Sequence, residues 1–276
     1  MIKSIENKVK LHNGVEIPQF GLGVYKVEEG QTIIETVKLA LSYGYRSIDT
    51  AAIYGNEEGV GTAVKESAIQ RDKLFITTKL WNDDQGYDRT LKAFETSLRK
   101  LDLDYIDLYL IHWPGKDKYV ETWKAFERLY DEGLVRAIGV SNFHEHHLEE
   151  LLTNANEKPT VNQIELHPRL SQETLRDYCK SKGIKVEAWS PLAKGRLLNE
   201  PTINYIANKH GKTPAQVILR WHLQNDIIVI PKSVSPKRLK ENADIFDFQL
   251  SLDEMNQLDQ LNMNERTGRN PDNLLF

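Results

Sequence analysis

Four polar residues that can take part in proton transfer follow three successive strand-like runs of the sequence. They are Asp49, Tyr54, Lys79 and His112. The runs Tyr45–Thr50, Leu74–Leu80 and Tyr105–Trp113 are rich in β-branched and aromatic residues, and each precedes a helix-like stretch, which is typical of parallel β/α units. In a closed β/α barrel the chemistry gathers at the C-terminal ends of the strands. We therefore expect a carboxylate, a phenol, an ammonium and an imidazole to meet there as a proton-transfer site.

Each of these residues also has an ordinary structural interpretation. A single aspartate such as Asp49 is compatible with a strand end or a cap, and a single lysine such as Lys79 with a solvated surface side chain. Their joint placement at consecutive strand ends favours catalysis over these interpretations.

The pattern predicts an α/β fold, a (β/α)8 TIM barrel that occupies residues 1–276 as a single domain. The chain has 276 residues, close to the ~250 that are typical of such barrels. Seven spacers separate the strand candidates, and each is long enough for a crossover helix. The eight candidates are Phe20–Tyr25, Tyr45–Thr50, Leu74–Leu80, Ile106–His112, Val135–Ser141, Thr160–Leu166, Lys185–Ser190 and Ile227–Lys232.

Additional elements are predicted around the barrel. Residues 8–18 alternate apolar and polar side chains about Asn13-Gly14, which indicates an N-terminal β-hairpin with a type I′ turn. Capping boxes at Thr213–Gln216 and Ser251–Glu254 begin two helices. Helical segments near 201–210 and 251–262 exceed the eight that strict alternation needs, so two extra helices are expected. Residues 262–276 lack periodicity and are interpreted as a tail.

Composition limits the possible partners. The 40 acidic and 36 basic residues give a net charge of −4, which does not favour nucleic acid or an anionic membrane surface. The single Cys179 excludes a disulfide framework and is expected to pack within a helix. No apolar run has the length of a signal-peptide core or of a membrane span. We expect a cytoplasmic, monomeric protein with a small-molecule partner.

A phosphate site is predicted after the eighth strand, whereas no Rossmann or Walker A motif is present. Gly21-Leu22-Gly23 and Gly59-Val60-Gly61 lack the third glycine at the required spacing. Ser235 is instead a natural N-cap that precedes Pro236, so the positive end of a helix would face the barrel mouth. Lys232 and Arg238 flank this helix start. The alternative interpretation is that these basic side chains are simply solvated and bind no phosphate.

The remaining strand ends offer groups for a planar ligand. Amides and hydroxyls occur at Ser141, Asn142, Gln163 and Ser190, and Trp189 provides an aromatic face, although it is also compatible with a core aromatic. Tyr25, Trp81 and Trp113 follow strands 1, 3 and 4 and could wall an apolar pocket, whereas Trp123 and Trp221 lie in helical stretches and are expected to pack against the barrel.

A histidine cluster, His144, His146 and His147, resembles a metal site by count. It opens a polar helix and lacks a convincing set of carboxylates. No metal is predicted, and the cluster is expected to be solvated.

Six separated motifs resemble those of the aldo-keto reductase family. They are SIDTAAIYGNEEGVG, ITTKLWN, LIHWPG, AIGVSNF, VNQIELHP and IPKSV…RLKEN, and the similarity runs from the hairpin to the C-terminal Leu-Leu-Phe. Bacterial glyoxal and methylglyoxal reductases are the most similar group within the family, with 2,5-diketogluconate reductases and prostaglandin F synthase-like enzymes as near relatives.

The resemblance implies NADPH/NADP+ as cofactor and a reduction of carbonyl compounds. It implies that Asp49, Tyr54, Lys79 and His112 form the catalytic tetrad, with His112 also contacting substrate. Trp189 takes the place of the family's usual tyrosine under the nicotinamide. The implied cofactor residues are Ser141, Asn142, Gln163, Trp189, Ser190, Leu192, Lys232, Ser233, Val234, Arg238, Glu241 and Asn242.

The predicted mechanism has Tyr54 as proton donor, with Lys79 lowering the pKa of its phenol, Asp49 orienting the lysine and His112 directing the carbonyl oxygen. The predicted substrates are small aldehydes and dicarbonyls, namely methylglyoxal, glyoxal and aromatic aldehydes. Three alternatives stay open: reduction of 2,5-diketogluconate-type keto-sugars, an NADPH-binding redox sensor, and a phosphate-binding barrel isomerase.

Overall fold

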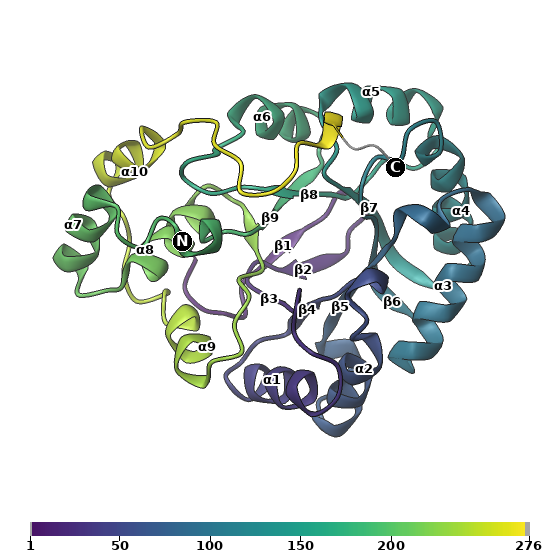
Figure 1. Ribbon diagram of the computed structural model, residues 1–276, viewed down its shortest axis with the longest axis horizontal. Coiled ribbons are helices and arrows are strands. Elements are labelled where there is room, and N and C mark those ends of the chain that lie inside the picture. Colours follow the sequence, from purple (N-terminus) through teal and green to yellow (C-terminus); the bar gives the residue numbers. More distant parts are fainter. Residues whose placement is uncertain (1, 274–276) are drawn as a thin grey trace.

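Eight parallel strands form a barrel that helices surround (Figure 1). The computed structural model describes residues 2–273. Neighbouring strands follow the order of the chain from β3 to β10, and the barrel closes where the Gly21 N–H donates to the Val229 carbonyl over 2.9 Å. The predicted (β/α)8 fold is confirmed. The strands are β3 Leu22–Gly23, β4 Ser47–Asp49, β5 Phe75–Leu80, β6 Ile106–Ile111, β7 Val135–Ser141, β8 Val161–Glu165, β9 Lys185–Trp189 and β10 Ile228–Val229.

The first and last strands are shorter than predicted, and both lie at the closing seam. A Cβ on Gly23 would lie 2.7 Å from the Ile230 carbonyl oxygen, so glycine permits the close approach of the two chain segments. Pro231 has no N–H to continue the ladder beyond β10. Lys232 and Tyr25, predicted as the last residues of these strands, therefore lie in loops.

The helices follow the predicted alternation, with α7 and α10 as the two extra helices. The Thr213 and Ser251 capping boxes are both present at the starts of α8 and α10. Trp123 in α4, Trp221 in α8 and Cys179 in α6 are buried, as predicted. The helices are α1 Gln31–Ser42, α2 Glu57–Glu66, α3 Tyr87–Leu101, α4 Tyr119–Asp131, α5 Glu145–Asn154, α6 Glu173–Lys182, α7 Pro201–His210, α8 Pro214–Gln224, α9 Pro236–Ala243 and α10 Leu252–Asp259.

None of the helices in residues 2–273 is both long enough and apolar enough to cross a membrane.

An N-terminal hairpin, β1 Lys8–Lys10 and β2 Glu16–Pro18, covers one end of the barrel. The predicted type I′ turn is wrong. Gly14 has φ 90°, but Asn13 is not among the residues with positive φ, and the Gly14 N–H donates to Leu11 O over 3.0 Å. A three-residue loop with a glycine bulge therefore replaces the two-residue turn.

The barrel interior is apolar at the hairpin end and polar at the other. Val9, Leu11 and Ile17 of the hairpin region form one hydrophobic cluster with interior strand residues, among them Phe75 and Leu108. The opposite end contains buried Asp49, Lys79, Gln163 and Glu187. The C-terminal ends of the strands thus hold the ionisable groups, as barrel enzymes require.

The C-terminal segment runs from α10 past β8 and α6 and ends beside α5 (Figure 1). It has no regular element before the short 3₁₀ helix η5, Pro271–Asn273, which agrees with the predicted tail. Glu165 at the end of β8 accepts hydrogen bonds from the N–H groups of Thr267 and Gly268, at 2.6 and 3.1 Å. Residues 274–276 of the predicted tail, which include the Leu-Leu-Phe end, lie outside the described residues.

Candidate active site

Asp49 and Lys79 form a buried ion pair at the mouth end of the barrel. Lys79 Nζ donates to Asp49 Oδ1 over 2.5 Å and to the Thr50 carbonyl over 2.9 Å. Burial alone would lower the pKa of Lys79, but the charge and hydrogen bond of Asp49, together with Tyr54 and Glu187, outweigh burial and raise the pKa above its ordinary value. The adjacent strands β4 and β5 bring the two residues together, and the pair places a fixed positive charge inside the barrel.

Tyr54 lies beside this pair, in the 3₁₀ turn η1 Ala52–Tyr54 after β4. The Lys79 ammonium is 5.1 Å from the centroid of its ring. Asn56 holds the turn in place, because it accepts from Thr50 Oγ1 over 2.6 Å and donates to the carbonyl of Val24 over 2.9 Å. The phenol is therefore positioned by a polar network between two loops rather than by a strand.

The predicted net shift of the Tyr54 pKa is wrong. Burial raises the pKa of Tyr54 to about 12, although the Lys79 ammonium acts in the opposite direction, as expected. The sequence revealed the charged neighbour but not the extent of burial. The phenol is consequently protonated at neutral pH, which is the state that a proton donor requires.

His112 follows β6 and is buried between two aromatic rings. Its ring centroid lies 5.7 Å from that of Tyr54 and 5.3 Å from that of Trp81. Burial, with a smaller contribution from Lys79, lowers the pKa of His112 well below its ordinary value. Buried Nδ1 has no hydrogen-bond partner among the described residues. Because an unpaired buried N–H costs more than an unpaired lone pair, the proton belongs on Nε2.

Glu187 is a site residue that the sequence did not reveal. Gln163 Nε2 donates to Asp49 Oδ2 over 2.8 Å and to Glu187 Oε2 over 2.7 Å, and β8 and β9 are paired at these positions. Burial, followed by the charge of Asp49, raises the pKa of Glu187 to about 8. The side chain is therefore mostly a neutral acid at neutral pH. Both amide protons of Gln163 are used, which leaves its oxygen for a ligand.

Asn142 joins three strand ends. Its Nδ2 donates to the His112 carbonyl and to Ser141 Oγ, and its Oδ1 accepts from Trp189 Nε1 over 2.8 Å. Its φ is +65°, in the left-handed region where asparagine is enriched among non-glycine residues. The predicted planar-ligand residues Ser141, Asn142, Gln163 and Trp189 are thus brought into one connected network.

Trp189 is covered on one side by the C-terminal segment. A Cβ on Gly268 would lie 2.4 Å from the edge of the indole, so glycine allows the segment to approach this closely. Ser190 has φ 48°, and its carbonyl accepts from the Ala193 N–H over 2.8 Å in the same loop as partly buried Leu192.

The predicted phosphate residues surround the start of α9. Ser235 caps the helix through its hydrogen bond with the Arg238 N–H. The side chains of Lys232 and Arg238 are exposed and form no salt bridge with any residue that the structure describes. Two exposed cations beside a helix N-terminus fit an anionic group such as a phosphate. Of the other predicted members, Val234 is exposed, Glu241 is partly buried, and Ser233 and Asn242 are buried.

The predicted substrate-pocket aromatics lie around Tyr54 and His112. The Tyr25 ring is 5.0 Å from that of Tyr54, and Trp81 contacts His112. Trp113 lies 6.5 Å from Trp189, across the network from the other two. The three aromatic residues therefore reach both the proposed proton donor and the proposed ring platform.

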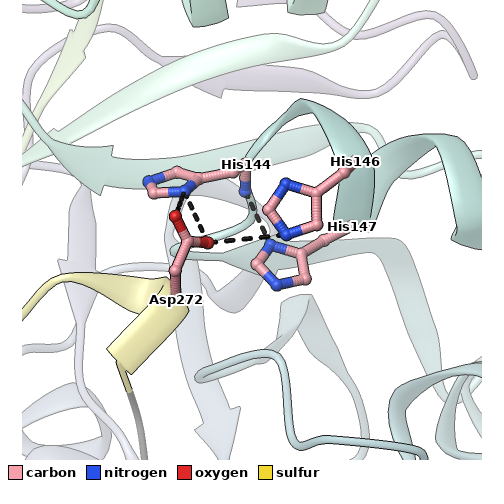
Figure 2. Close-up of side chains that lie close together, drawn as sticks. All are labelled: His144, His146, His147 and Asp272. Atoms are coloured by element: carbon pink, nitrogen blue, oxygen red, sulfur yellow. Dashed lines mark hydrogen bonds and ion pairs between the residues drawn. The ribbon is translucent and has the colours of Figure 1, made fainter.

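The histidine cluster differs from its prediction. His146 is exposed as expected, but His144 and His147 are half-buried. Asp272 of the C-terminal segment approaches all three histidines (Figure 2). The sequence could not reveal this carboxylate, because it lies 128 residues from His144 along the chain.

Comparisons with known proteins agree with this site. Residues 19–263 match the model of the aldo/keto reductase family. The chain belongs to this family. It is 63% identical over its whole length to glyoxal reductase from Bacillus subtilis, with 100% of both chains covered, and 48% identical to methylglyoxal reductase DkgA from Escherichia coli, with 96% of each chain covered. A solved mutant of Gox0644 in complex with NADPH has a TM-score of 0.94 and 48% identity over 98% of this chain and 99% of that one.

This aldo/keto reductase is therefore an oxidoreductase of carbonyl compounds.

Proposed function

We propose that this aldo/keto reductase uses NADPH to reduce small aldehydes and dicarbonyls, such as methylglyoxal, glyoxal and aromatic aldehydes, to alcohols, with Tyr54 as proton donor. One observation carries the proposal: a protonated phenol lies between a buried Asp49–Lys79 ion pair and a neutral imidazole. The names of glyoxal reductase and methylglyoxal reductase among its relatives support the substrate class.

When bound, NADPH supplies a hydride to the carbonyl carbon. Tyr54 donates its proton to the carbonyl oxygen, and the nearby Lys79 ammonium stabilises the phenolate that remains. The ammonium lies 5.1 Å from the centroid of the ring. Two unit charges at about this separation, with an effective dielectric constant of about 20, attract by roughly 3 kcal/mol. Asp49 compensates and orients the lysine, since an unpaired buried ammonium is costly. His112 donates from Nε2 to the carbonyl oxygen and orients it.

The cofactor residues are proposed from the same network. The Gln163 amide oxygen and the Ser141 and Asn142 groups would hold the carboxamide, and Trp189 would stack on the nicotinamide ring. Lys232 and Arg238 would pair with the 2′-phosphate through charge-assisted hydrogen bonds. Ser190, Leu192, Ser233, Val234, Glu241 and Asn242 would complete the site.

The aromatic residues around Tyr54 and His112 support small substrates. Tyr25, Trp81 and Trp113 offer flat apolar walls, while Tyr54 and His112 are the polar groups that would contact an oxygen. An electron-withdrawing neighbour makes a carbonyl carbon more receptive to hydride, so less binding energy is needed from parts of the substrate remote from the carbonyl.

We further propose that the chain is a single domain, a monomer and a cytoplasmic protein.

The test is NADPH consumption across a panel of methylglyoxal, glyoxal, 4-nitrobenzaldehyde, a keto-sugar and a bulky ketosteroid. The highest kcat/KM is expected for the dicarbonyls and the aromatic aldehyde. NADPH binding without turnover of any member would favour a redox sensor, and a preference for the keto-sugar would favour a 2,5-diketogluconate-type reductase. A ketosteroid with the highest kcat/KM would overturn the small-pocket proposal.

A further inference from the structure

A cluster of His144, His146, His147 and Asp272 lies away from the tetrad, between the start of α5 and the C-terminal segment (Figure 2). One candidate ligand atom from each residue lies within 4.8 Å of the other three. A tetrahedral ion with bonds near 2.1 Å needs its ligand atoms roughly 3.4 Å apart. Small rotations of the side chains, two of which are exposed, would therefore bring ligand atoms to this spacing.

The hydrogen bonds of His144 identify it as a support rather than a ligand. Its Nε2 accepts from Arg266 over 3.0 Å, so its proton is on Nδ1, which lies 2.9 and 3.0 Å from the two oxygens of Asp272. The N–H thus orients the carboxylate. A ligand histidine would have to release this proton, whereas a histidine that holds a ligating carboxylate in place can keep it.

His147 and His146 offer the ring nitrogens that an ion would use. His147 Nδ1 accepts from the His144 backbone N–H over 3.1 Å, so it carries no proton, and a bound ion would take over this lone pair from the N–H. His146 Nε2 lies 3.5 Å from Asp272 Oδ1. The two imidazole rings are adjacent, with centroids 3.9 Å apart. Two ring nitrogens and one carboxylate oxygen therefore lie within 4.8 Å of one another.

The alternative to a metal site is an ordinary helix cap, in which His147 accepts the hydrogen bond of the His144 backbone N–H. That alternative accounts for His144 and His147 but assigns no role to His146. It also does not explain why a carboxylate from a distant segment approaches the ring nitrogens of more than one histidine. The positive end of α5 and Arg266 both oppose a cation, which favours an exchangeable ion over a permanently bound one.

We propose that His146, His147 and Asp272 form a binding site for a divalent transition-metal ion of the zinc type, with His144 orienting Asp272. Two imidazoles and one carboxylate suit zinc better than magnesium or calcium, which prefer oxygen ligands. The side chains of His146 and Asp272 are 63% and 42% exposed, so an ion can enter from solvent.

The ion would fasten the C-terminal segment to α5. Asp272 is four residues from Gly268, which contacts Trp189, and five from Thr267, which donates to Glu165. Fixing Asp272 therefore restricts the motion of the part of the segment that covers Trp189, the residue proposed to stack on the nicotinamide ring. The bound state should show slower opening of this segment.

The first experiment is calorimetric titration of untagged, chelator-treated protein with ZnCl2. One ion per chain is expected, with affinity at least tenfold weaker in His146→Ala and in Asp272→Asn. His12→Ala is the matched control, because His12 is an exposed histidine outside the cluster, and it should bind as the wild type does. MgCl2 should give no saturable binding.

Either of two results overturns the proposal. One is the absence of saturable zinc binding by the wild type. The other is wild-type affinity in Asp272→Asn, which would mean that any bound ion is held without the C-terminal segment. Circular dichroism of each variant confirms that the barrel is folded, as expected for substitutions of exposed side chains.

A second experiment tests the link between the ion and the segment. Hydrogen–deuterium exchange of a peptide spanning residues 264–273 should slow at least threefold when zinc is added to the wild type. No change is expected for Asp272→Asn or for peptides from α7 on the far side of the barrel. An unchanged exchange rate of this peptide in the wild type at saturating zinc would refute the proposal that the ion fastens the C-terminal segment to α5.

Discussion

Replacing Glu187 with glutamine is expected to stabilise the protein at neutral and alkaline pH but not at acidic pH. Glu187 is 1% exposed, and burial with the charge of Asp49 raises the pKa of its carboxyl from 4.5 to about 8. An acid whose pKa is raised on folding is favourable in the folded state while it stays protonated. Its contribution is complete below pH 4.5 and is lost as the pH rises towards about 8.

The magnitude follows from the two pKa values. One pKa unit corresponds to about 1.4 kcal/mol, so the wild type should lose roughly 3 kcal/mol between about pH 5 and pH 8 through this group. Glutamine keeps the acceptor for Gln163 Nε2 but has no proton to lose. The difference between variant and wild type should therefore grow by roughly 3 kcal/mol, which is about 6 °C or more in Tm.

The assay is thermal unfolding of both proteins across this pH range. Glu95→Gln is the matched control, because it makes the same side-chain replacement at an exposed position of α3. A Tm difference that stays constant with pH would refute the argument. So would a variant that is less stable than the wild type at every pH, since Glu187 would then contribute as a carboxylate.

Four further substitutions test the site. Tyr54→Phe should lower kcat by about 10²–10⁴ while the NADPH Kd changes little; near-wild-type kcat would exclude Tyr54 as the acid. Lys232→Met and Arg238→Met should each weaken NADPH about tenfold or more and NADH far less; equal losses in a fluorescence titration would place the 2′-phosphate elsewhere. Gly268→Ala should displace the segment that covers Trp189, at a cost of about 1–3 kcal/mol, and raise the KM for cofactor; an unchanged KM and Tm would contradict the close approach.

The sequence predicted those site residues that follow strands. Asp49, Lys79 and His112 each end a run of β-branched or aromatic residues, and the order of strands in a barrel is the order of the chain. Neighbouring strand ends therefore meet, and the Asp49–Lys79 pair follows from that rule. Local capping signals were equally reliable, because the Thr213 capping box depends on residues three positions apart.

Contacts across the barrel or from distant segments could not be predicted. Glu187 lies within a strand, and it is connected to Asp49 through Gln163, which reaches from one side of the interior to the other. Asp272 meets His144 only because the C-terminal segment runs from α10 past β8 and α6 to the start of α5 (Figure 1). The predicted direction of the Tyr54 pKa shift was wrong for a similar reason. The presence of Lys79 can be read from the sequence, whereas the burial of Tyr54 depends on all the elements that surround it.

The buried groups Asp49, Lys79 and Glu187 also link the pH dependence of stability to that of kcat. With Asp49 and Lys79 paired, a protonated Glu187 leaves the three groups without net charge. Its ionisation above about pH 8 adds a negative charge that acts on Lys79, the ammonium beside Tyr54. That charge opposes a developing phenolate, so kcat of the wild type should fall as the pH rises through this region. Tyr54 itself titrates only at about 12, so it cannot cause such a fall. Glu187→Gln should therefore move the alkaline limb of the kcat profile to higher pH, and coincident limbs in the two proteins would show that Glu187 does not act on the proton donor.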